Sequence, residues 1–187
     1  MKLILNFLIA LFFFQIGISQ CNEKTFPHNF ARQTWITFLG ESSKLIGSGN
    51  LFFFGFKLYE IALIGPKEIS SKNYFDYSFA LTLKYSKSFN KERIANISKK
   101  EINKLKIASS DEIKIWHKWM LQNFPDITSG DTLTGIYSPK DGIQIYYNRT
   151  LFAENESISF AKAFFSIWLH EKTSEPKLRR KILNISN

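Results

Sequence analysis

The sequence predicts an α+β fold in which helices cover one face of an antiparallel sheet. The order of its hydrophobic patterns is the first indication, because strand patterns, two helical patterns, further strand patterns and two further helical patterns follow one another. Phenylalanine is the second, since 19 of the 187 residues are Phe and large aromatic rings supply much of a core. The single cysteine, Cys21, excludes an intrachain disulfide, so packing must hold the domain.

The first residues are typical of a secretory signal. A basic start precedes an almost wholly apolar run, Leu3–Phe14, and small residues follow it. The run is shorter than the roughly 20 residues that a spanning helix needs, which disfavours a retained membrane anchor. We therefore expect residues 1–19 to be a signal peptide and the protein to be exported, most simply to a periplasm. Lipidation of Cys21 is the alternative, disfavoured because Gln20 is not small.

The segment after the signal, residues 20–43, contains one short strand candidate, Arg32–Phe38. The main domain is expected over residues 44–187, and Lys44–Ile64 is predicted to be one long strand. Its apolar residues fall on both alternating faces, as in a strand that is covered on both sides. Glycines inside this strand indicate a bend, a bulge or the close approach of another segment. They are Gly47, Gly49 and Gly55.

The middle of the chain changes from strand to helix periodicity. Tyr77–Tyr85 alternates large apolar residues with small or polar ones, which predicts a half-buried strand. Asn90–Lys106 has helical spacing with a lysine-rich outer face. Asp111–Phe124 is predicted to be a second helix, which Pro125 ends.

Two strands and two helices complete the predicted fold. Thr132–Tyr137 and Ile143–Tyr147 are strands joined by a loop whose proline and Asp-Gly pair are typical of a turn. Ser157–Leu169 is a helix, and Ser174 is the predicted N-cap of the last helix, with Pro176 in its first turn. The first of these helices has an apolar stripe expected to pack in the core: Phe160, Ala161, Phe164, Phe165 and Trp168.

Charge and histidine placement exclude two classes of function. The formal net charge of +9 suits nucleic acid, but carboxylates such as Glu92 and Glu101 lie among the lysines, and an exported chain meets little nucleic acid. We expect no nucleic-acid partner and instead a weak attraction to anionic lipid surfaces. The three histidines, His28, His117 and His170, are too scattered for a metal site, so neither a metal nor another cofactor is expected.

Three stretches carry a resemblance to a known family. They are FFFGFKLYEIALIGP (Phe52–Pro66), FPDITSGDTLTGIYSP (Phe124–Pro139) and FAKAFFSIWLHEKTSEPKLRRKIL (Phe160–Leu183). In them the chain resembles the bacterial exported branch of the chalcone isomerase-like family, over about Leu45–Leu183. The resemblance implies an open-faced β-sandwich of chalcone isomerase type, a large antiparallel sheet backed by helices, with a ligand cleft between the long strand and the helices. The family includes plant enzymes that close chalcones to flavanones and non-catalytic members, some of which bind fatty acids.

The residues of those enzymes are only partly matched. Their catalytic arginine lies near the start of the long strand, where this chain reads Asn50-Leu51-Phe52-Phe53, and residues 33–92 contain no arginine. Such a donor stabilises the developing enolate, and its loss lowers the rate by about 100-fold or more. The resemblance places Tyr59 where the enzymes have a water-holding threonine. It places Asn90 or Lys91 where they have a tyrosine, and neither replaces a phenol.

Two functions remain open from the sequence. The first is a non-catalytic binding protein whose cleft, lined by Phe52, Phe54 and Phe56, takes an apolar small molecule such as a fatty acid, with Lys57 or Tyr59 at its polar head. The second is an intramolecular lyase of the chalcone–flavanone isomerase type, in which Tyr59 and Lys57 polarise the carbonyl of an enone-like substrate. Core packing of the aromatic residues and a solvated Lys57 are the alternatives without a ligand. The missing arginine favours the binding protein over the enzyme, and a structural part in an envelope complex is a third possibility.

Overall fold

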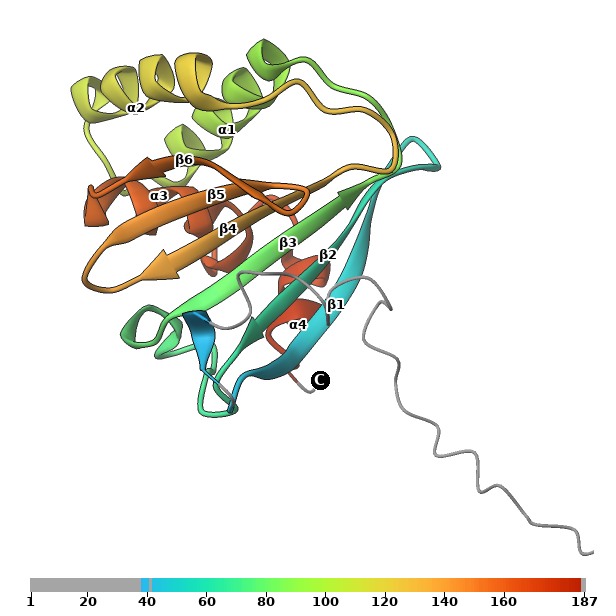
Figure 1. Cartoon of the computed structure of the whole chain (residues 1–187), viewed down its shortest axis with the longest axis vertical. Helices are drawn as coiled ribbons and strands as arrows, with labels where there is room; N and C mark the ends of the chain where they lie inside the picture. The colour runs from blue at the N-terminus through green and yellow to red at the C-terminus, as the bar shows by residue number, and fades with distance from the viewer. Residues whose placement is uncertain (1–37, 41, 186–187) are drawn as a thin grey trace, which may run out of the picture.

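The computed structural model describes residues 38–40 and 42–185, which form one antiparallel sheet and four α-helices (Figure 1). The strands are β1 (Lys44–Phe53), β2 (Phe56–Gly65), β3 (Phe79–Tyr85), β4 (Thr132–Ser138), β5 (Gly142–Tyr147) and β6 (Thr150–Asn155). The helices are α1 (Lys91–Leu105), α2 (Ser110–Asn123), α3 (Ile158–Leu169) and α4 (Pro176–Ile182), with a short 3-10 helix at Tyr74–Asp76. The six strands lie in the sheet in chain order, so each pairs with its neighbours in sequence.

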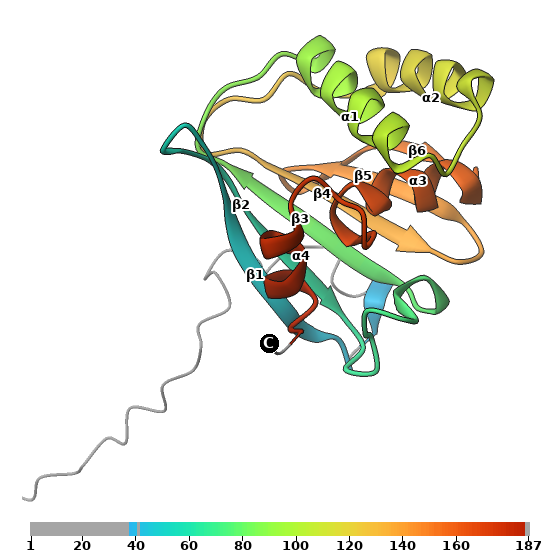
Figure 2. The same ribbon diagram turned by 180° about the vertical axis from the view of Figure 1, so that it is seen from behind.

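The helices are arranged on one side of the sheet. Helices α3 and α4 lie behind the sheet in Figure 1 and in front of it in Figure 2, with α4 packed on β1 and β2. Helix α1 packs against both α2 and α3. The predicted architecture, an antiparallel sheet backed by helices, is therefore confirmed.

The main core lies between the sheet and these helices. Phe165 of α3 meets Phe79 of β3 edge-to-face, with ring centres 4.9 Å apart, and Phe79 stacks on Tyr137 of β4 at 5.1 Å. The residue opposite the ring of Phe165 on β4 is Gly135, and a Cβ there would lie only 2.9 Å from the ring. Absence of a side chain at Gly135 thus lets α3 approach the sheet closely.

The opposite face of the sheet also carries buried residues. A smaller apolar cluster consists of Leu39, Ala62, Ile64, Ala80, Ile136 and Tyr146. Between these residues the hydroxyl groups of Thr82 and Thr134 form a buried hydrogen bond of 2.9 Å. The prediction of a half-buried β3 is therefore wrong in its centre, because Ala80 and Thr82 are as fully buried as the large residues beside them. The side chains on that face are small because other residues pack closely over it, and not because the face is in contact with solvent.

The predicted single strand over Lys44–Ile64 is also wrong. The chain reverses at Phe54 and Gly55, so that Phe53 pairs with Phe56 and two strands form instead of one. Both turn residues have positive φ, 48° and 80°, as in the two-residue type I′ hairpin. A bulky aromatic residue is rare at such a position, and for that reason the sequence pattern did not reveal the turn.

The glycines of β1 fulfil the expectation of a bulge and a close approach. The pairing of β1 with β2 shifts register between Leu45 and Gly47. A Cβ at Gly47 would collide with the main-chain carbonyl oxygens of Lys181 and Ile182 in α4. The last helix therefore lies directly on the backbone of the first strand.

Most predicted helix ends agree with the structure. Asn90 caps α1 by accepting a hydrogen bond from the Arg93 amide at 3.0 Å, and Ser109 is the N-cap of α2. Two features differ from the prediction. Helix α4 has Glu175 rather than Ser174 as its N-cap, and strand β6 was not predicted because Thr150–Asn155 lacks a clear apolar face.

Some predictions concern residues outside the described part of the chain. The predicted signal peptide, residues 1–19, lies there, as does nearly all of the predicted strand Arg32–Phe38. These assignments, and the domain boundary at residue 44, stay predictions. Within residues 38–40 and 42–185, none of the helices has the length and hydropathy of a membrane span.

Candidate functional site

A cavity of about 460 Å³ lies between the sheet and the helices. This volume falls within the range of small-molecule sites, roughly 300–1,000 Å³. Strands β3, β4 and β5 and helix α3 form its inner wall, which is apolar. That wall is made by Leu81, Leu83, Leu133, Ile145, Phe164 and Phe165.

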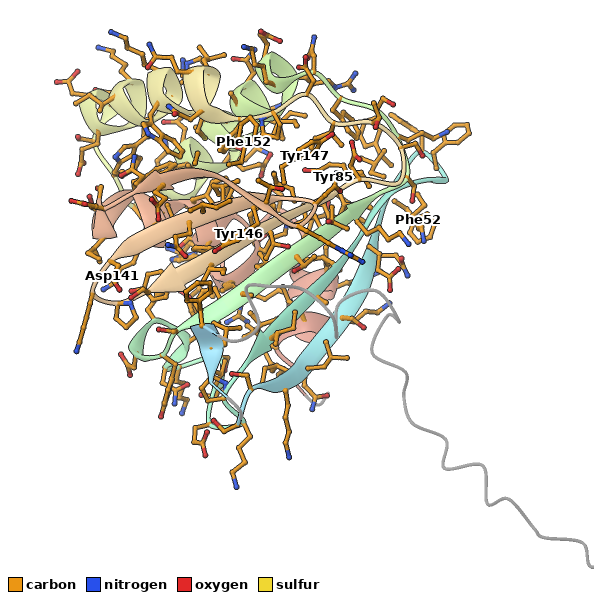
Figure 3. All side chains as sticks on the ribbon, in the orientation of Figure 1. Phe52, Tyr85, Asp141, Tyr146, Tyr147 and Phe152 are labelled. Atoms are coloured by element: carbon orange, nitrogen blue, oxygen red, sulfur yellow. The ribbon has the colours of Figure 1, made fainter. Side chains whose placement is uncertain are left out.

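Two tyrosines and one tryptophan bring polar groups to this apolar cavity. Tyr59 of β2 and Tyr85 of β3 are paired across the two strands, with ring centres 5.7 Å apart. Trp168 of α3 donates a hydrogen bond from Nε1 to the Tyr59 hydroxyl oxygen at 3.0 Å. All three line the cavity, and Figure 3 shows Tyr85 at the end of β3 where the chain leaves for α1.

Both phenols are held in the neutral form. Burial raises the pKa of Tyr59 well above its ordinary value, and the hydrogen bond from Trp168 only partly opposes this. Burial likewise raises the pKa of Tyr85, which is 7% exposed. Among the described residues, neither hydroxyl has an acceptor for its own proton. Each is therefore a neutral donor that an oxygen atom of a ligand can satisfy.

Charged residues gather at the rim of the cavity. Lys104 of α1 is 2.7 Å from a carboxylate oxygen of Glu101, and Ser174 donates a hydrogen bond to the other oxygen. This small network joins α1 to the loop before α4. Burial, followed by the charge of Glu101, raises the pKa of the neighbouring Glu175.

Two other cations of α1, Arg93 and Lys100, also line the cavity. The guanidinium group of Arg93 lies 5.4 Å from the centre of the Phe89 ring. Within the part of the chain that the structure describes, neither cation forms an ion pair with a carboxylate. They are thus available to an anionic group that enters the mouth of the cavity.

The structure brings only one of the five predicted ligand-binding residues to this cavity. Tyr59 lines it, but Phe52, Phe54 and Phe56 lie at the end of the β1–β2 hairpin, where they are 57%, 86% and 63% exposed. Lys57 is exposed and also lies outside the cavity lining. The hairpin explains the difference, because the three phenylalanines and Lys57 lie at its exposed end, whereas Tyr59 lies further along β2 beside Tyr85 of β3. A direct ligand contact at the other four stays a prediction.

Most lining residues were not predicted as site residues, and they include Trp168, Tyr85 and Arg93. Trp168 was expected to pack in the core, and Tyr85 to be an ordinary buried strand residue. Arg93 follows the arginine-free stretch, residues 33–92, and enters the cavity from α1 rather than from a strand. Repeated aromatic residues were the available signal for Tyr85 and Trp168, but that signal does not separate a cavity wall from a packed core.

Residues that the resemblance placed at an enzyme's tyrosine have local roles. Asn90 caps α1, and the amide of Lys91 donates a hydrogen bond to Asp126 at 2.8 Å. The described histidines are likewise engaged locally, His117 with Asn96 at 2.7 Å and His170 with the amide of Lys172 at 3.0 Å. None of these four residues lines the cavity.

Comparison with known proteins adds a family and a fold. A family model described as chalcone isomerase-like matches residues 28–184. An uncharacterized protein of Haemophilus influenzae is 29% identical over 138 residues, which cover 74% of this chain and 66% of that protein, so the chain spans just under two thirds of its relative. A crystal structure of a fatty-acid binding protein of Arabidopsis thaliana is similar with a TM-score of 0.60 and 12% identity, covering 78% of this chain and 88% of that one. The structural likeness confirms the predicted fold class.

Proposed function

The chain belongs to the chalcone isomerase-like family, and on that premise we propose that it binds an apolar small molecule, such as a fatty acid, without catalysing a reaction. One observation carries the proposal: the apolar cavity presents three donors, Tyr59, Tyr85 and Arg93, that lack a protein acceptor or anionic partner among the described residues. The fatty-acid binding protein of Arabidopsis thaliana, which has the same fold, supports this class of ligand.

The polarity of the cavity suits an acyl chain with an acidic head. The chain would lie against Leu81, Leu133 and Phe165 on the inner wall, where each buried methylene contributes about 0.8 kcal/mol. The carboxylate would lie at the mouth, where the Tyr59 hydroxyl donates a neutral hydrogen bond and Arg93 supplies charge. About ten buried methylenes thus give roughly 8 kcal/mol, part of which offsets the entropy lost on binding.

The geometry gives less support to the alternative, an intramolecular lyase. That mechanism requires Lys57 and Tyr59 to act on one carbonyl, yet Lys57 is exposed and lies outside the cavity lining. Strands β1 and β2 contain no arginine that would stabilise an enolate. Binding of an apolar ligand therefore accounts for the residues of the cavity better than a lyase reaction does.

The site of action is also part of the proposal. The basic start and apolar run of residues 1–19 support export, and a periplasm is the compartment that we propose. An exported carrier of this kind would hold a fatty acid or similar ligand outside the cytoplasm.

A titration tests the proposed function. Delipidated protein is titrated with palmitate by calorimetry, and we expect one ligand per chain. A tryptophan at Ile97, which lines the mouth of the cavity, should weaken binding by at least about tenfold, or about 1.4 kcal/mol. The matched control is Ile115→Trp, since Ile115 is an exposed isoleucine of α2 outside the cavity lining.

Two results would overturn the proposal. One is the absence of binding to palmitate and to other amphiphiles of similar length. The other is turnover of a chalcone to a flavanone by the purified protein that is lost on Tyr59→Phe, which would establish the lyase.

A further inference from the structure

The end of the β1–β2 hairpin exposes four phenylalanine rings to solvent. Phe52, Phe53, Phe54 and Phe56 are 57%, 58%, 86% and 63% exposed. The hairpin extends beyond the body of the domain in Figures 1 and 2, and Figure 3 shows Phe52 on it. Large apolar side chains clustered together in solvent mark a surface that contacts another molecule or a membrane.

At the tip of the hairpin an aromatic residue, Phe54, has a strained backbone conformation. Phe54 has a φ of 48°, a left-handed conformation that suits glycine or asparagine and is unfavourable for a bulky side chain. It is also the most exposed ring of the four, so it contributes little to the core. A ring held in strain and in solvent indicates a surface function rather than a folding function.

The charged residue of the hairpin tip, and the one that packs on its rings, are both lysines. Residues 50–59 contain no aspartate or glutamate, and Lys57 follows the last ring. Lys87 lies beside them, with its Nζ 5.4 Å from the centre of the Phe56 ring. Aromatic rings surrounded by lysines match an anionic lipid surface, where rings enter the headgroup region and cations meet the phosphates.

From these observations we propose that the tip of the β1–β2 hairpin docks on an anionic membrane surface and holds the mouth of the cavity against it. Phe53 connects the two features, because it is exposed on the hairpin and also lines the cavity. A ligand then passes between the bilayer and the cavity without crossing bulk water. This transfer rests on the proposed function, whereas the docking itself does not.

Charge disfavours a second copy of the chain as the occupant. Two such tips placed together would bring Lys57 and Lys87 of each copy close to those of the other, with no carboxylate in residues 50–59 to compensate. A lipid headgroup supplies the compensating negative charge. The proposal therefore commits to the membrane, and dimerisation is an outcome that the test distinguishes.

Vesicle binding tests the docking. The protein as isolated from producing cells is sedimented with vesicles of three parts phosphatidylcholine to one part phosphatidylglycerol that contain no fatty acid. Changing Phe52, Phe54 and Phe56 together to serine should weaken binding by at least about tenfold, because three rings no longer leave water. The control is Leu151→Ser with Phe152→Ser, which removes exposed apolar side chains of β6, 41% and 48% exposed, far from the hairpin. Any contribution of residues 1–37 is common to all variants.

A second variant separates charge from ring insertion. Lys57→Gln with Lys87→Gln keeps the rings, so it should weaken binding to the anionic vesicles but not to vesicles of phosphatidylcholine alone. Circular dichroism and the urea midpoint verify that each variant is folded.

Equal vesicle binding by the parent and the triple serine variant would overturn the docking. So would a concentration-dependent dimer of the parent that the triple variant loses, with no binding to vesicles. The palmitate titration in solution reports on the proposed function separately.

Discussion

Trp168 Nε1 donates a hydrogen bond of 3.0 Å to the hydroxyl oxygen of Tyr59, which lies 109 residues earlier in the chain. This bond joins α3 to β2 across the wall of the cavity. It satisfies the buried indole N–H and fixes the phenol ring, while leaving the phenol proton for another acceptor. The pair thus links the stability of the domain to the polarity of the cavity.

Tyr59→Phe should lower both stability and affinity for palmitate. The indole N–H of Trp168 would lose its acceptor, which costs about 1–3 kcal/mol. In urea unfolding, the double variant with Trp168→Phe should be less destabilised than the two single changes added together. The control is Tyr146→Phe on the opposite face of the sheet, which should change ligand affinity little. Additive effects at Tyr59 and Trp168 would contradict an energetic coupling between them.

Asp131 should make the domain sensitive to acid. Burial alone would raise its pKa, but hydrogen bonds from Tyr147, Thr128 and Asn148 outweigh burial and lower the pKa to about 2 from the ordinary 3.8. A lowered folded-state pKa means that this carboxylate stabilises the fold above pH 3.8, and that the contribution is lost as the pH falls toward 2. Asp131→Asn should therefore reduce the dependence of the unfolding free energy on pH between about 4 and 2.

Urea unfolding at several pH values measures this effect. Asp141→Asn is a suitable control, because Asp141 is an exposed carboxylate of the β4–β5 turn, and among the described residues its side chain accepts a hydrogen bond only from Ser138. An unchanged pH dependence in Asp131→Asn would show that other carboxylates govern the acid response.

A methyl group at Gly47 should destabilise the domain much more than one at Gly49. At Gly47 a Cβ meets main-chain carbonyl oxygens of α4, which cannot move without shifting the helix, so we expect a loss of about 1–3 kcal/mol. At Gly49 the nearest atom, 2.6 Å away, is a terminal methyl of Leu178, which a rotamer change can displace. Thermal unfolding of Gly47→Ala and Gly49→Ala measures the difference. Similar midpoints for the two variants would argue against close packing of α4 on β1.

Phe54→Asn should stabilise the fold and weaken membrane docking at once. Asparagine tolerates the left-handed backbone, and an Asn-Gly pair is the preferred type I′ turn, so the free energy of unfolding should rise by about 1 kcal/mol. Phe56→Asn is the control, because Phe56 is similarly exposed but lies within β2 and outside the positive-φ turn. Urea unfolding and vesicle sedimentation measure the two effects. A destabilised Phe54→Asn would mean that the ring contributes to folding after all.

The sequence predicted the elements whose periodicity was clear. Helices α1, α2 and α3 and strands β3, β4 and β5 were expected near their observed bounds, because each has one dominant apolar face or a recognisable cap or turn. The β1–β2 hairpin was missed because its turn carries Phe54 at a position where asparagine, aspartate or glycine is typical. Both strands also have apolar residues on both faces, so the pattern ran through the turn without a break.

The candidate site was harder to predict than the fold. Tyr59 was identified through the family resemblance, but its partner Trp168 comes from α3 and its cross-strand neighbour Tyr85 from β3. Those contacts depend on register and helix placement, which a periodic pattern does not specify. Arg93 entered the cavity from a helix, whereas the resemblance directed attention to a strand.

The contact between β1 and α4 has a consequence for how the chain folds during and after synthesis. It joins the first described strand to the last described helix, so the loop that must close spans nearly the whole domain. Contacts so distant in sequence are entropically expensive to form and slow the folding of a domain. A growing chain cannot form the contact between β1 and α4 until α4 has left the ribosome. For a chain predicted to be exported, that delay would postpone the completion of packing on β1 until synthesis is nearly finished.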